Sequence, residues 1–201
     1  MVRTVSTMLE LGTTAPDFSL LEPATGEQKC LADFADAKAL LVMFICNHCP
    51  YVLRIEDGLA GLGDEFKNDG VAIVAIGPND ADNYPDDSPE KIAERVKDKG
   101  YTFPYLFDAT QDVAKAYAAA CTPDFFLFDG GRKLVYRGQF DDARPGNEID
   151  VTGKDMKEAI RRVLADEAQV ENQIPSMGCN IKWKPGNAPE YFTGVRAGGS
   201  K

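Results

Sequence analysis

The sequence predicts an α/β fold in which one central mixed β-sheet is flanked by helices on both faces. Two nearly continuous apolar runs, 38–45 and 71–76, suit buried central strands. Helical apolar periodicity follows the first run and helix-capping residues follow the second, while Gly130 and Gly131 can turn a hairpin between two later strands. At 201 residues and 44% hydrophobic content, the chain is long enough to bury one core.

The first helix is predicted between the two apolar runs. Its buried side chains recur at steps of three and four, and Asn68 and Gly70 end the pattern. The members of this stripe are Val52, Ile55, Leu59, Leu62 and Phe66. The helix therefore starts directly after Cys49.

Three further helices are expected. In the second, Ser88 can cap, Pro89 suits the first helical position and Gly100 can end the helix. A third covers roughly 110–120, and a fourth has its apolar face on Met156, Ile160, Val163 and Leu164. The remaining strands are predicted at 104–107, 125–128 and 133–137.

The C-terminal part of the chain lacks periodicity. We therefore divide the sequence into a domain over 1–170 and an extended tail over 171–201, packed on that domain with a frayed, Gly-rich end. Its single tryptophan, Trp183, is expected to anchor the tail to the domain.

Charge and targeting signals exclude several classes of partner. Lys and Arg total 22 against 32 Asp and Glu, a net charge of −10, so neither nucleic acid nor an anionic membrane is expected to bind. The first residues lack the apolar core of a secretory signal, and no later stretch is long enough to span a bilayer. These features predict a cytoplasmic protein.

The segment "MFICNHCPYV", residues 43–52, concentrates the chemistry. Five cysteines are too few for a disulfide framework in a chain of this length, so redox or metal chemistry is expected. Cys49 falls at a helix N-terminus, where the helix dipole favours a thiolate, the attacking species. Pro50 fits the first helical position, and Cys46 is spaced to form a reversible disulfide with Cys49.

Other interpretations of this segment stay open. Cys46, His48 and Cys49 offer three zinc ligands, but structural zinc takes four and the chain has no second C-x-x-C pair. We predict no metal and no cofactor, with His48 as a hydrogen-bonding or electropositive neighbour of the thiols. The cysteines could also be buried residues without chemistry. The acidic segment 79–90 lacks the calcium-loop pattern and is expected to be a solvated loop.

Several segments resemble the alkyl hydroperoxide reductase and thiol-specific antioxidant family, the peroxiredoxin-like branch of the thioredoxin superfamily. They are "LGTTAPDFSL" (11–20), "ALLVMFICNHCPYV" (39–52), "VAIVAIGPND" (71–80) and "DVAKAYAAACTPDFFLFDGGRKLVYRGQFDD" (112–142), in the family's order. The resemblance implies a thioredoxin-like fold with an N-terminal extension.

The resemblance also implies roles for single residues. Cys49 matches the reactive cysteine, and Thr122-Pro123 matches a cis-proline turn facing it, where the Thr122 backbone can pair with an extended thiol partner. Cys121 is expected close by. Two departures bear on peroxide chemistry: Cys46 replaces the family's threonine, and no arginine precedes the "FLFD" strand. Charge on a reacting peroxide would thus lack two of its usual stabilisers.

Together these observations predict a thiol oxidoreductase. Cys49 attacks either a peroxide, which gives a sulfenic acid, or a disulfide, which gives a mixed disulfide. Cys46 is the nearest cysteine that could resolve this product, and Cys179 and Cys121 are further candidates for the resolving thiol. An external thiol would reduce the product, and a homodimer is one possible assembly. The alternative is a non-catalytic binding module that uses the Pro123 turn and the Trp183 tail, with metal at Cys46, His48 and Cys49.

Overall fold

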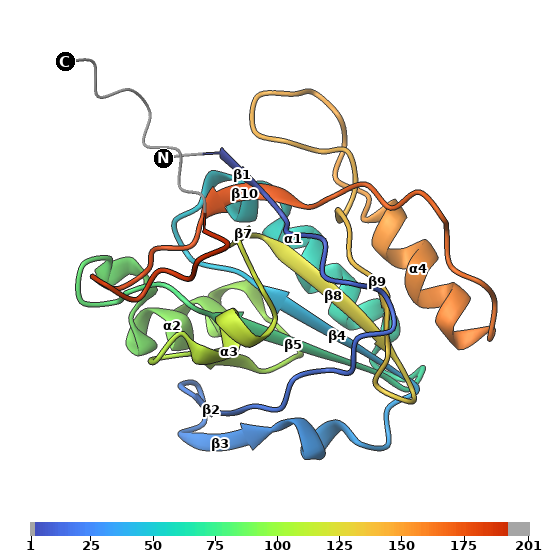
Figure 1. Ribbon diagram of the computed structural model, residues 1–201, viewed down its shortest axis with the longest axis horizontal. Helices are drawn as coiled ribbons and strands as arrows, with labels where there is room; N and C mark the ends of the chain where they lie inside the picture. The colour runs from blue at the N-terminus through green and yellow to red at the C-terminus, as the bar shows by residue number, and fades with distance from the viewer. Residues whose placement is uncertain (1–2, 193–201) are drawn as a thin grey trace.

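A seven-stranded mixed sheet forms the centre of the computed structural model, which describes residues 3–192. Its strands lie in the order β3-β2-β6-β5-β4-β8-β9 (Figure 1). Their bounds are β2 (Ser19–Glu22), β3 (Glu27–Cys30), β4 (Ala39–Phe44), β5 (Val71–Gly77), β6 (Tyr105–Phe107), β8 (Asp124–Asp129) and β9 (Leu134–Tyr136). The predicted fold class is confirmed.

The central strand β4 is buried along its whole length. It pairs in parallel with β5 and antiparallel with β8, so its neighbours cover both edges. Its two faces are also covered, since alternate residues belong to two different core clusters. A strand covered on both faces needs no polar alternation, which explains the unbroken apolar run in the sequence. The β8–β9 hairpin turns at Gly130 and Gly131, as predicted.

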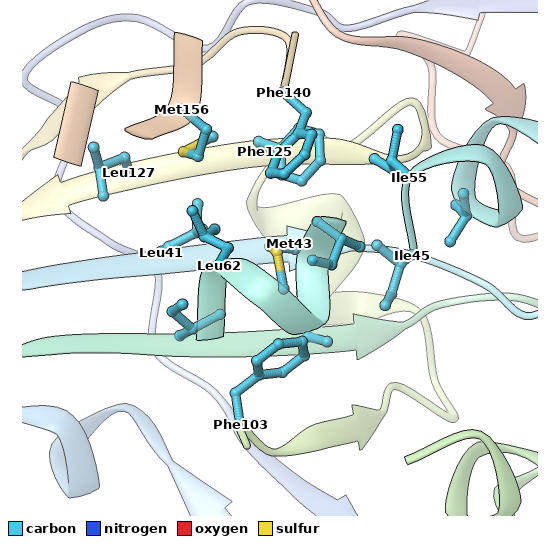
Figure 2. Close-up of a cluster of buried hydrophobic side chains, with 14 of the residues drawn as sticks. Leu41, Met43, Ile45, Ile55, Leu62, Phe103, Phe125, Leu127, Phe140 and Met156 are labelled. Atoms are coloured by element: carbon cyan, nitrogen blue, oxygen red, sulfur yellow. The ribbon is translucent and has the colours of Figure 1, made fainter. Parts of the chain in front are cut away.

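Helices cover both faces of the sheet. One core cluster joins alternate residues of β4 to the helices α1 (Pro50–Phe66), α2 (Pro89–Lys99) and α4 (Lys154–Leu164). Figure 2 shows Leu41 and Met43 of β4 and Phe125 of β8 near Ile55 and Leu62 of α1. The other face packs against α3 (Asp112–Ala116) and the N-terminal segment.

Two sequence expectations differ from the structure in this part. The third helix is much shorter than 110–120, because Gln111 and Ala118 have positive φ angles of 66° and 50° at its two ends. Strands β2 and β3, together with two short 3-10 turns, Leu31–Phe34 and Pro85–Asp87, were not predicted. Their sequences are short and mixed in polarity. The two strands form because they pair within the sheet, and no local sequence pattern predicts them.

A second, three-stranded sheet lies at one end of the central sheet, at the top of Figure 1. In it β10 (Met177–Asn180) pairs antiparallel with both β1 (Arg3–Val5) and β7 (Cys121–Thr122). The segment from 171 thus contains a strand. The sequence analysis did not predict it, because the four residues "MGCN" are too short a run and include a glycine.

The tail also packs on the domain through Trp183, which contacts the second core cluster and the Phe192 ring. The domain boundary at 170 stays a prediction, and the predicted frayed end lies largely outside the described residues. None of the helices within residues 3–192 has the length and apolar character needed to cross a bilayer.

Candidate active site

Cys49 lies at the junction of β4 and α1, as the sequence predicts. It is the N-cap residue of α1, and Pro50 occupies the first helical position. Its side chain is fully buried, and in the thiol form Sγ donates to the carbonyl oxygen of Thr122 at 3.1 Å. The Cys49 sulfur is therefore enclosed by the end of β7 and the start of α1.

Several donors converge on the Cys49 sulfur and hold its pKa far below the ordinary thiol value. The largest contribution is a hydrogen bond from the Cys179 thiol, followed by one from the Cys46 thiol. Backbone N–H groups of Val52, in the first turn of α1, and of Cys179 act in the same direction, while burial opposes them. Hydrogen bonds to a charged form favour that form, so Cys49 is the thiolate of the group.

The neighbouring thiols shift the opposite way. The adjacent Cys49 sulfur and burial raise the pKa of both Cys46 and Cys179. Cys46 Sγ also lies 3.1 Å from Thr122 Oγ1. Cys121 is fully buried, donates to the Pro123 carbonyl at 3.4 Å, and has a pKa raised mainly by desolvation. These opposite pKa shifts favour one ionised sulfur, that of Cys49, beside protonated thiols.

The Thr122-Pro123 peptide bond is cis, as the resemblance implies. Thr122 contacts both cysteines of the C-x-x-C segment, through its hydroxyl to Cys46 and its carbonyl to Cys49. Beside it, β10 pairs with β7 so that Cys179 lies opposite Thr122. Three of the predicted site residues, Cys46, Cys49 and Cys179, therefore lie around Thr122.

His48, which is partly exposed, forms an ion pair with the buried Asp87 that the sequence analysis missed. Its Nδ1 lies 2.8 Å from Asp87 Oδ2, and this contact raises the pKa of His48 above its ordinary value. Asp87 also accepts from the Asn47 backbone N–H at 2.7 Å and from Asn79 Nδ2 at 2.8 Å. The ring of Tyr84 stacks on His48 at 5.7 Å between centroids. Asp87 thus fixes the loop that carries His48.

The acidic segment 79–90 is consequently not the simple solvated loop that was expected. Asn79, Asp80 and Asp87 are buried, although the predicted cap at Ser88 is present. Asn79 and Asp80 bond the backbone of Lys182 in the tail, so tail packing buries the loop. The Ser88-Pro89 helix start predicted a turn just before the helix. Nothing in the neighbouring sequence indicates that Asp87 pairs with His48.

The ligand atoms of Cys46, His48 and Asp87 lie within 4.8 Å of one another. In this grouping Asp87 takes the place that the sequence analysis gave to Cys49. Three ligands fall short of the four of a structural zinc site, and Asp87 already accepts hydrogen bonds from Asn47 and Asn79. The donor set fits the positioning of His48 better than a closed metal centre.

The lowered pKa of Cys49 predicts a thiolate at neutral pH. Ultraviolet thiolate absorbance should persist below about pH 7, where an ordinary thiol of pKa near 8.5 is protonated. Because the folded-state pKa is depressed, Cys49 contributes stability above its unfolded pKa, and this contribution is lost as pH falls through the folded pKa. The Cys49→Ser variant should lack the neutral-pH absorbance. Equal absorbance in the two proteins would contradict the assignment.

Fold and site together define a thioredoxin-fold protein with a buried cysteine at a helix N-terminus. The chain belongs to the AhpC/TSA family, whose pattern matches residues 11–137. It is 32% identical over 126 residues to the thiol-disulfide oxidoreductase ResA of Geobacillus kaustophilus, covering 63% of this chain and 67% of that one.

Two solved structures extend the comparison. A hypothetical protein from Sinorhizobium meliloti is 52% identical, with a TM-score of 0.90 over 91% of this chain and all of that one. The peroxidoxin BcpB of Mycobacterium tuberculosis shares the fold at 18% identity and a TM-score of 0.58, over 78% of this chain and 97% of that one. The prediction of a thiol-dependent oxidoreductase is confirmed at the level of the family.

Proposed function

We propose that this protein catalyses thiol-disulfide exchange with Cys49 as the attacking thiolate. The observation that carries the proposal is the set of hydrogen bonds on the Cys49 sulfur, which stabilises the ionised form beside two protonated thiols. Attack on a disulfide gives a mixed disulfide, which a second thiol of the same chain resolves. Cys46, the partner expected from the sequence, and Cys179 are the two candidates, and an external thiol then restores the reduced protein.

Peroxide reduction is the second candidate, favoured by the AhpC/TSA family membership. Peroxide attack by Cys49 would give a sulfenic acid that the same neighbouring thiols could condense with. The Thr122 hydroxyl contacts Cys46, and Cys46 itself stands where peroxiredoxins carry their threonine. A bound peroxide would therefore lack those donors, which supports disulfides as the better substrates. Location in the cytoplasm and a homodimer stay predictions.

One experiment separates these functions. Reduced protein receives about one equivalent of glutathione disulfide or of hydrogen peroxide, an amount set by a single reactive thiolate. Differential alkylation and peptide mass spectrometry then report the state of each cysteine over time. We expect Cys49 to react first, and faster with the disulfide. Faster reaction with peroxide would reverse the order of the two candidates. Slow, equal oxidation of all five cysteines would instead favour the non-catalytic binding module.

A further inference from the structure

The chain's own β10 occupies the sheet edge that an extended thiol partner is expected to use. Cys179 lies opposite Thr122 and Asn180 opposite Cys121 in an antiparallel pair. This is the strand addition by which a polypeptide can bind an exposed edge. β1 pairs with the other side of β10 and holds it in place. The partner strand at this edge is therefore intramolecular.

Gly178 is required for this docking. A Cβ atom at position 178 would lie 2.0 Å from the Thr122 carbonyl oxygen and 3.0 Å from Pro123 Cδ. Backbone atoms cannot yield such space by a change of rotamer, so a larger residue would move β10 away from β7. The residue directly before Cys179 thus sets how close that cysteine comes to Cys49.

The contacts of Cys179 favour it over Cys46 as the resolving thiol. Its thiol makes the largest contribution to stabilising the Cys49 thiolate, and its backbone N–H also points at that sulfur. The Cys46 sulfur also forms a hydrogen bond with the Thr122 hydroxyl, so it is not directed at Cys49 alone. Cys179 is therefore directed at Cys49 by both its side chain and its backbone.

The surrounding charges act in the same sense. Once Cys49 is in a mixed disulfide, its negative charge no longer opposes ionisation of its neighbours. The Asp87 carboxylate still raises the pKa of Cys46, although the Thr122 hydroxyl partly offsets it. Lys182, in contrast, lowers the pKa of Cys179. Because a resolving thiol reacts as its thiolate, this difference favours Cys179.

We propose that Cys179 is the catalytic resolving thiol and that β10 is a built-in partner strand, positioned by Gly178. The proposal rests on attack by Cys49. The Cys49 thiolate bonds to one sulfur of a disulfide and releases the other as a thiolate. The Cys179 thiolate then bonds to the Cys49 sulfur and releases the second substrate sulfur. The substrate gains two electrons and the cysteine pair loses them. The Cys179 proton passes to one product thiolate, and solvent protonates the other.

This arrangement also indicates a substrate class. A polypeptide cannot pair with Thr122 while β10 occupies the edge. The closed site therefore suits low-molecular-weight disulfides.

The test maps the first intramolecular disulfide after addition of glutathione disulfide to the reduced full chain. Wild type and Cys46→Ser should form Cys49–Cys179, whereas Cys179→Ser should retain glutathione on Cys49. Gly178→Ala should slow formation of Cys49–Cys179 about 100-fold, the effect that a misplacement of about 1 Å can have. Gly61→Ala is the matched control, because no atom lies within 4 Å of its added Cβ. It should react as wild type does.

A first disulfide between Cys46 and Cys49 in wild type would overturn the inference while leaving the proposed function intact. An unchanged rate in Gly178→Ala would overturn the positioning role. Absence of any reaction at Cys49 would overturn both proposals. Circular dichroism reports whether Gly178→Ala is folded; if it is not, the Cys46→Ser and Cys179→Ser pair still decides which thiol resolves.

Discussion

Replacing Cys49 with serine should lower disulfide turnover at least about 1000-fold, because a hydroxyl remains protonated where the thiolate acts. The substitution keeps the size of the side chain and the contact with the Thr122 carbonyl, so the fold should remain. Turnover is measured with glutathione disulfide as substrate and dithiothreitol as reductant, corrected for their direct reaction.

Cys30→Ser is the matched control for this loss. Cys30 ends β3 in the outermost strand of the central sheet, away from β4 and β8, and is only half-buried. Its replacement should leave turnover unchanged. If Cys49→Ser retained more than about a tenth of wild-type turnover, another residue would have to be the nucleophile.

Replacing Asp87 with alanine should lower the free energy of unfolding by about 1–3 kcal/mol, the cost of leaving buried hydrogen-bond donors without a partner. The carboxylate is 2% exposed and accepts hydrogen bonds from Asn47 and Asn79 while contacting His48. Its removal leaves these buried donors without an acceptor. Chemical denaturation measures the loss, and the exposed neighbour Asp86 provides the control substitution Asp86→Ala.

The same variant has a second, spectroscopic readout. His48 is the only histidine of the chain, so its proton signals titrate without overlap in NMR spectra. Because Asp87 raises its pKa, His48 contributes stability below its unfolded pKa of about 6.5, and this is lost as pH rises through the folded pKa. In Asp87→Ala the His48 pKa should fall. An unchanged pKa would mean that another group sets the charge of His48.

The sequence predicted the parts of the site that local pattern controls. The apolar run of β4 and the stripe from Val52 to Phe66 place Cys49 at a helix start, and both are readable from neighbouring residues. The resemblance supplied the cis bond before Pro123. The prediction of thiol chemistry rested on these two features, the helix start at Cys49 and the cis bond before Pro123.

What the sequence did not predict depends on contacts between distant segments. Asp87 approaches His48 only because the loop after β5 folds under the tail. Gly178 matters only because β10 docks on Thr122, more than fifty residues earlier, and a glycine before a cysteine carries no such signal alone. The shortened α3 likewise follows from its backbone turns.

The pairing of β1 with β10 joins Arg3–Val5 to the candidate active site. Arg3–Val5 supports the very strand that presents Cys179 to Cys49. An affinity tag or deletion at the N-terminus is therefore expected to change the position of β10 and of Cys179. Assays of its redox chemistry therefore require that Arg3–Val5 remain intact.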